Sequence, residues 1–176
     1  MKNISDFYLH KLITNPKFNS KNPVNDANLL LPDFSIELDR CIQFYRITYP
    51  DQDISFTETY RSNALQKIHF NNGASKIKKN GMHHYGIAAD CIFSINGKRT
   101  YKGDINLIRK IFRDNGLTIL GMWDALHVQF VEVSAQQKLR DFVSKSISAF
   151  QRANFLEPTG EADHKTIAKA KEVFLI

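Results

Sequence analysis

The chain has 176 residues, 43% of them hydrophobic, which is enough to bury the core of one main domain with a small appendage. It carries 24 Lys and Arg residues against 18 Asp and Glu residues, and this formal charge of +6 favours an anionic partner such as nucleic acid, anionic lipid or an anionic wall polymer. No run approaches ~18 apolar residues and the first residues lack the apolar core of a signal peptide, which excludes membrane insertion and predicts a protein made as a soluble cytosolic chain.

The first part of the sequence changes from a helical to an extended pattern. Apolar residues at helical spacing predict a short helix over residues 4–14, followed by a polar loop. A second periodic segment, residues 34–45, predicts a helix that faces the core. Alternating polar and apolar residues predict a half-buried strand over residues 53–60, and Ser62 can cap the helix that follows it.

The remaining segments predict a basic loop at residues 71–81, a strand with a tight turn at residues 87–97 and an amphipathic helix at residues 105–115. They then predict a second strand at residues 126–133 and two helices around a turn at residues 135–176. The predicted fold class is therefore α+β, a compact domain with a small antiparallel sheet flanked by helices, plus a C-terminal helical pair. Cys41 and Cys91 lie beside apolar residues without a Cys-x-x-Cys spacing, so we expect reduced thiols in the core.

Side chains capable of chemistry gather at the edges of predicted strands. Asp90 lies on a strand among apolar residues, and burial of its charge requires a partner, which a metal ion would be. A neighbouring antiparallel strand could place His127 beside Asp90. Two histidines and a carboxylate match the three protein ligands of a catalytic zinc. Because no His-Glu-x-x-His or paired Cys-x-x-Cys spacing occurs, a structural histidine and a capping or ion-paired aspartate remain the alternative.

Three ordered motifs, spread over residues 28–133, resemble those of one peptidase family. The segment His83-His84-Tyr85-Gly86-Ile87-Ala88-Ala89-Asp90 has the pattern His-x-x-Gly-x-Ala-x-Asp. It resembles the metal-binding signature of the VanY-like D-alanyl-D-alanine carboxypeptidases and L-alanyl-D-glutamate endopeptidases. Upstream, Tyr60-Arg61-Ser62 resembles the family's Tyr-Arg-Ser turn, and downstream, Asp124-Ala125-Leu126-His127 resembles its Asp/Glu-x-x-His.

The resemblance implies a compact α+β domain of the type shared with the hedgehog signalling domain, and one bound zinc ion. The implied ligands of this ion are His83, Asp90 and His127. The implied general base is Asp124, and Arg61 would face the substrate carbonyl and the developing oxyanion. The residues expected to contact substrate are Tyr60, Ser62, His84 and Gln66.

Two features depart from the family pattern or leave a choice open. The family usually has serine two residues before the first ligand histidine, where this chain has Gly81. The adjacent pair His83 and His84 offers two candidate ligands, and on an extended backbone the two side chains point to opposite faces. The spacing to Gly86 and Asp90 selects His83, with His84 as the alternative ligand or as a substrate contact.

An aspartate base is more typical of the family's endopeptidases, found in phage lysins, than of its carboxypeptidases. The resemblance therefore implies a zinc-dependent L-alanyl-D-glutamate endopeptidase that acts on bacterial peptidoglycan as a phage lysin, as a monomer, after release to the wall or as part of a virion. A D-alanyl-D-alanine carboxypeptidase and a non-catalytic wall-binding or phage structural protein are the alternatives. We do not expect a nucleic-acid partner, because the lysines of residues 76–79 have no aromatic residues among them.

The expected domain organisation is a zinc peptidase domain at residues 1–134 and a C-terminal helical segment at residues 135–176. Residues 148–156 and 159–166 resemble part of the helical peptidoglycan-binding module that is often attached to wall hydrolases. The alternative is a helical pair that packs on the catalytic domain.

Overall fold

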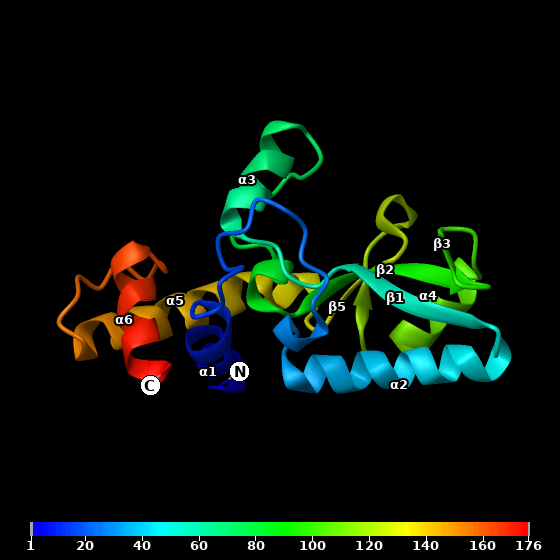
Figure 1. Ribbon diagram of the computed structural model, residues 1–176, viewed down its shortest axis with the longest axis horizontal. Helices are drawn as coiled ribbons and strands as arrows, with labels where there is room; N and C mark the ends of the chain where they lie inside the picture. Colours follow the sequence, from blue (N-terminus) through cyan, green and yellow to red (C-terminus); the bar gives the residue numbers. More distant parts are fainter. Residues whose placement is uncertain (1, 176) are drawn as a thin grey trace.

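The structure is a computed structural model that describes residues 2–175, and it confirms the predicted α+β fold (Figure 1). The first helical segment is α1 (Lys2–Phe7), which continues into a π-helical turn, η1 (Tyr8–Leu12). After the predicted loop, a short turn at η2 (Ala27–Leu29) leads into α2 (Pro32–Thr48). The proline suits the first position of α2 because its fixed φ is already helical. The buried residues of α2 recur at threes and fours, as predicted: Phe34, Leu38, Cys41, Ile42 and Tyr45.

Within the described residues, the sheet has five strands that pair antiparallel, as expected. The strands are β1 (Gln52–Glu58), β2 (Ala88–Ile95), β3 (Lys98–Thr100), β4 (Thr118–Ile119) and β5 (His127–Gln129). Their order is β1-β2-β5-β4, and β3 pairs with β2 through the Asn96-Gly97 turn. Helix α4 (Ile105–Asp114) packs on α2, which runs along one side of the sheet (Figure 1).

The strand register brings residues from distant parts of the sequence together. Asp90 in β2 is the Cα partner of His127 in β5 on one side and of Glu58 in β1 on the other. The ladder between β1 and β2 is irregular between Phe56 and Glu58, where the register shifts. Since directly opposite residues of antiparallel strands have Cβ atoms about 4.5–5.5 Å apart, the side chains of Asp90 and His127 can meet. The sequence had indicated that a neighbouring antiparallel strand could place His127 beside Asp90, and the register agrees with this expectation.

Two predicted strands are longer than the strands in the structure. The strand expected over residues 53–60 ends at Glu58, and the backbone N–H groups of Thr59 and Tyr60 instead donate to the carbonyl oxygen of Val24 at 2.7 and 3.1 Å. The strand expected over residues 126–133 is reduced to β5. The Gln129 side chain donates to the Val131 carbonyl oxygen at 2.6 Å, which turns the chain away from the sheet toward η5 (Val133–Ala135).

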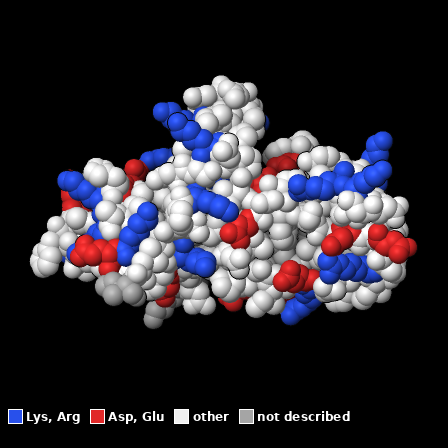
Figure 2. Space-filling model, in the orientation of Figure 1, with Lys and Arg blue, Asp and Glu red and all other residues white. Residues whose placement is uncertain are grey.

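Helix α3 (Asn63–Asn71) and the loop after it project from the body of the molecule (Figure 1). Ser62 caps α3, as predicted, by accepting a hydrogen bond from Leu65 N at 3.0 Å. Lys side chains lie on this projection (Figure 2), and one of them, Lys79 in the loop after α3, is ion-paired with Glu161. The sequence between Glu58 and Asp90 contains no Asp or Glu, so this part of the surface is basic.

The C-terminal pair consists of α5 (Gln136–Ala153) and α6 (His164–Phe174), which pack against α1 and η1. Their buried side chains join the core of the preceding residues: Leu139, Val143, Ile147 and Ala170. The turn between the helices is held by Gln151, whose side-chain amide donates to the Thr159 and Thr166 hydroxyl groups. A functional boundary between residues 134 and 135 stays a prediction. Within residues 2–175, no helix has both the length and the apolar character needed to cross a membrane.

Gly86, in the His-x-x-Gly motif, occupies a position that only glycine fits. Its φ is +67°, and a Cβ atom there would overlap the carbonyl oxygen of Leu29. We expect Gly86→Ala to lower the free energy of unfolding by about 3 kcal/mol or more, because steric overlap adds to the cost of the left-handed conformation. The matched control is Gly97→Ala, with φ +74° and no atom within 4 Å, which should cost about 1 kcal/mol. Urea denaturation checks both values, and equal losses would contradict the packing argument.

Candidate metal centre

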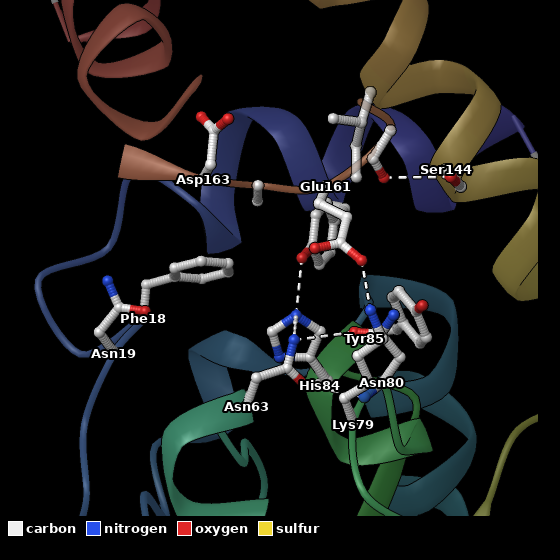
Figure 3. Close-up of a pocket in the computed structure, with 14 residues that line it drawn as sticks. Phe18, Asn19, Asn63, Lys79, Asn80, His84, Tyr85, Ser144, Glu161 and Asp163 are labelled. Atoms are coloured by element: carbon white, nitrogen blue, oxygen red, sulfur yellow. Dashed lines mark hydrogen bonds and ion pairs between the residues drawn. The ribbon is translucent and has the colours of Figure 1, made fainter. Parts of the chain in front are cut away.

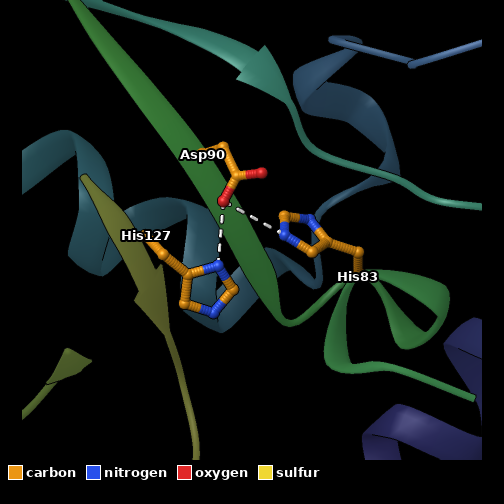
Figure 4. Close-up of side chains that lie close together, drawn as sticks. All are labelled: His83, Asp90 and His127. Carbon is orange, nitrogen blue, oxygen red and sulfur yellow. Dashed lines mark hydrogen bonds and ion pairs between the residues drawn. The ribbon is translucent and has the colours of Figure 1, made fainter. Parts of the chain in front are cut away.

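His83, Asp90 and His127 converge at one point of the structure (Figure 4). His83 lies on the 3-10 turn η3 (Met82–Tyr85), Asp90 on β2 and His127 on β5. Asp90 Oδ1 lies 2.8 Å from His127 Nδ1 and 3.3 Å from His83 Nε2. One candidate ligand atom from each residue lies within 4.8 Å of the others, so these three side chains could hold one metal ion.

The hydrogen bonding of His83 supports this interpretation. The residue is 3% exposed, and neither of its ring nitrogens has a hydrogen-bond partner among the described residues, although Nε2 is close to Asp90. A buried polar group without a partner costs about 1–3 kcal/mol, and a metal ion would remove this cost. Nitrogen and carboxylate oxygen donors are also the types that divalent transition metals accept. The residues present therefore fit a bound metal ion.

Asp90 is held as a carboxylate in this cluster. Burial tends to raise its pKa, but His83 and His127 favour the charged form more strongly, so the pKa of Asp90 lies well below its usual range. Burial tends to lower the pKa of His127, but its hydrogen bond to Asp90 and the negative charges of Asp90 and Asp124 together raise this pKa overall. A carboxylate between two imidazoles presents a negative charge to a cation at the same point where two nitrogens can bind it.

The adjacent histidine, His84, points away from this cluster. Its Nε2 atom lies 2.7 Å from the Tyr8 hydroxyl group, and its Nδ1 atom lies 3.3 Å from the Arg61 carbonyl oxygen. Burial lowers the pKa of His84 to about 4, so its ring is neutral near pH 7. The structure thus brings His83, and not His84, to Asp90. His84 instead lines a cavity of about 180 Å³ between the core and the C-terminal segment, shown in Figure 3.

Asp124 lies beside the cluster but is further from its centre than the three candidate ligands. It belongs to the turn η4 (Met122–Asp124), and its Oδ2 atom is 3.9 Å from His127 Nδ1. Burial is the largest cause that raises the pKa of Asp124; Asp90 adds to the effect and His127 opposes it. A half-buried carboxylate with a raised pKa, next to a possible metal site, can accept and return a proton.

The loop that carries Asp124 is held by Arg109, which the sequence analysis did not single out. Arg109 Nη1 donates to the Ala125 carbonyl oxygen at 2.8 Å, and Nη2 donates to the Leu120 carbonyl oxygen at 2.6 Å. The two contacts lie on either side of Asp124. In the sequence, Arg109 is one of several charged residues in an amphipathic helix, so no pattern distinguishes it from its exposed neighbours.

Arg61 lies on the other side of Asp90, between two carboxylates. Its guanidinium group is ion-paired with Glu58, to which Nε donates at 2.7 Å, and it donates to Asp90 Oδ2 at 3.2 Å. Burial tends to lower the pKa of Arg61, but Glu58 and Asp90 raise it overall. Glu58, for which the sequence predicted no specific role, is buried and has no partner for its Oε1 atom among residues 2–175. Its position just before Tyr60-Arg61 was the available signal.

The other residues expected to contact substrate are buried and bonded to neighbouring loops. The Tyr60 hydroxyl group donates to the Phe18 carbonyl oxygen at 2.8 Å, and the Ser62 hydroxyl group donates to Ser20. Gln66 Nε2 donates to the Ile77 carbonyl oxygen at 2.6 Å. These contacts tie the segment after β1 and helix α3 to neighbouring loops. Direct substrate contact by Tyr60, Ser62 and Gln66 stays a prediction.

Gly81 stands where the resembled family usually has serine, and the contacts around this position explain the difference. A Cβ atom on Gly81 would lie 3.1 Å from Gln66 Oε1, closer than ordinary van der Waals contact. A serine at this position would therefore crowd the buried Gln66 side chain, which already ties α3 to the loop after it.

A comparison with models of protein families gives no match, and a comparison with curated proteins gives none either. Among solved structures, the chain is similar to the crystal structure of the Serratia marcescens L-Ala D-Glu endopeptidase ChiX. The two chains are 20% identical, the alignment covers 72% of this chain and 92% of that chain, and the TM-score is 0.48.

Proposed function

We propose that this protein is a zinc-dependent peptidase that cleaves the L-alanyl-D-glutamate bond of bacterial peptidoglycan. The observation that carries the proposal is the convergence of His83, Asp90 and His127, in which the ring nitrogens of His83 have no other partner in the described structure. The three residues belong to motifs that resemble those of one peptidase family. The proposed ligands are these three side chains, with one zinc ion and one position left for water or substrate.

When bound, zinc would polarise the scissile carbonyl group and make water more acidic. Asp124 is the proposed general base, placed by the loop that Arg109 holds. In this role its carboxylate takes a proton from the attacking water and returns it to the leaving amine. The raised pKa of Asp124 brings it closer to the neutral range in which such transfer is efficient.

Arg61 is the proposed partner of the oxyanion. The ion pair with Glu58 holds its guanidinium group beside Asp90, so its positive charge lies at the edge of the cluster. A fixed positive charge stabilises negative charge on the carbonyl oxygen most strongly in the transition state, because that charge develops only there.

The proposed physiological setting is that of a phage lysin. The charge of +6 and the basic projection around α3 would attract the protein to anionic wall polymers, an attraction that salt screens. We propose that residues 135–176 support the peptidase domain from the side of α1 and add a surface for the wall. A D-alanyl-D-alanine carboxypeptidase would use the same cluster and base on another bond, so the products distinguish the two activities.

The deciding experiment is to incubate the purified protein with peptidoglycan and to identify new chain ends by mass spectrometry. Parallel samples contain a chelator, or a chelator followed by added zinc. New N-terminal D-glutamate ends that disappear with chelator and return with zinc are expected. Release of D-alanine alone would replace the proposal with a carboxypeptidase. Binding to the wall without any new chain ends would contradict the peptidase and favour a non-catalytic wall-binding protein.

A further inference from the structure

Two large apolar side chains stand exposed at the edge of the candidate site. Trp123 is 81% exposed and Met122 is 61% exposed, and they directly precede Asp124 in η4. Trp123 is the only tryptophan of the sequence. Single exposed apolar residues are common on protein surfaces, but this indole belongs to the same short turn as the candidate catalytic carboxylate of Asp124. The position of Trp123 therefore points to a contact with substrate.

The indole of Trp123 is held in place although it is exposed. A Cβ atom on Gly121 would lie 2.5 Å from Trp123 Nε1 and 2.6 Å from Cδ1, so the ring rests on the bare Cα atom of that glycine. The turn is closed by a hydrogen bond of 3.0 Å from Asp124 N to the Gly121 carbonyl oxygen, and Arg109 holds both ends of the loop. A side chain that is already fixed loses little conformational entropy when a ligand covers it.

We propose that Trp123 is a stacking platform for a pyranose ring of the wall glycan, an inference that rests on the proposed function. One face of a pyranose ring presents C–H groups while its hydroxyl groups remain in water. Such a face can cover the apolar surface of an indole, and the indole N–H group remains available as a donor. Met122, the residue before Trp123, is also exposed and apolar.

The distance along the substrate favours a sugar over a distant part of the stem peptide. L-alanine, the first residue of a stem peptide, is joined to the lactyl group of the muramic acid, so only one residue separates the sugar from the L-alanyl-D-glutamate bond. One extended residue spans about 3.5 Å, which keeps the sugar close to Asp124 when this bond is cut. The terminal D-alanyl-D-alanine bond is three residues further away, about 10 Å, and would leave the platform without the sugar.

The test compares two substrates that differ in the sugar. One is a GlcNAc-MurNAc tetrapeptide, and the other is the same tetrapeptide with an acetyl group in place of the disaccharide. Trp123→Ala is expected to raise KM for the disaccharide substrate about tenfold and to change KM for the acetyl peptide less than about twofold, with kcat preserved. Trp123→Phe, which keeps an aromatic ring, should have a KM for the disaccharide substrate much closer to that of the unaltered protein than Trp123→Ala has. The matched control is Tyr101→Ala, which removes another aromatic side chain, 62% exposed, and should change neither KM value.

Fluorescence separates this inference from the proposed function, since all tryptophan emission comes from residue 123. The disaccharide tetrapeptide should shift the emission of chelator-treated protein, and the acetyl peptide should not. A shift of the tryptophan emission without any cleavage of the wall would support the role of Trp123 as a stacking platform and contradict the proposed peptidase activity. An equal rise of KM for both substrates would assign Trp123 to the peptide. Unchanged KM values, or no shift with the disaccharide substrate, would overturn the inference.

Discussion

Asp124→Asn is expected to reduce the rate of wall hydrolysis by about a thousandfold while the protein stays folded and keeps its metal ion. The amide has nearly the same shape as the carboxylate but cannot take a proton from water. Asp124 is not one of the three converging residues, and its side chain is 39% exposed, so the substitution leaves little buried surface unpaired. Rates of release of new chain ends, metal content and melting temperature are the measurements.

The matched control for this substitution is Asp114→Asn, which removes an exposed carboxylate paired with Lys110 at the end of α4. It should leave hydrolysis and metal content unchanged. If Asp124→Asn keeps more than about a tenth of the activity, the proton is transferred by another group. If it loses the metal ion instead, Asp124 acts as a ligand, and the assignment of the base is wrong.

His83→Ala and His84→Ala are expected to have opposite effects, although the two residues are adjacent. His83→Ala should abolish both metal binding and hydrolysis, because it removes one of three converging ligands. His84→Ala should keep one metal ion per chain but lower the free energy of unfolding by about 2–3 kcal/mol, since it leaves the buried Tyr8 hydroxyl group without its partner. Equilibrium dialysis gives the metal content, and urea denaturation of chelator-treated protein gives the stability.

His83→Ala and His84→Ala serve as controls for each other. Without metal, His83→Ala should destabilise the protein less than His84→Ala, since the ring nitrogens of His83 make no hydrogen bond within the described residues. Loss of metal in His84→Ala together with retained metal in His83→Ala would reverse the ligand assignment.

The features that could be predicted from the sequence were local. The spacing of Phe34, Leu38 and Tyr45 predicted α2, because a helical face is read from neighbouring turns of the same segment. The cap at Ser62 also depends only on nearby residues. One feature that is not local was also indicated: the alternation in the two segments showed that a neighbouring antiparallel strand could place Asp90 and His127 together, and the structure pairs them.

The features that were missed depend on contacts that no pattern of residue types records. Glu58 lies just after the register shift in the ladder between β1 and β2, and it is a buried ion-pair partner of Arg61, three residues further along the chain. Arg109 holds the Asp124 loop through backbone carbonyl groups, which carry no sequence signal. Strand β5 ends at Gln129, whose side chain donates to the Val131 carbonyl oxygen, and glutamine as a residue type neither favours nor breaks a strand by itself.

The pairing of β2 with β5 has a consequence for how the protein would bind a metal ion. Asp90 and His127 are 37 residues apart, so their meeting requires the closure of a long loop and the correct register. An unfolded chain therefore has no such site, and a metal ion that binds there stabilises the folded state in proportion to the logarithm of its free concentration. The resistance of this protein to unfolding would then depend on the concentration of free metal around it, and would be lower where metal is scarce and higher where it is abundant.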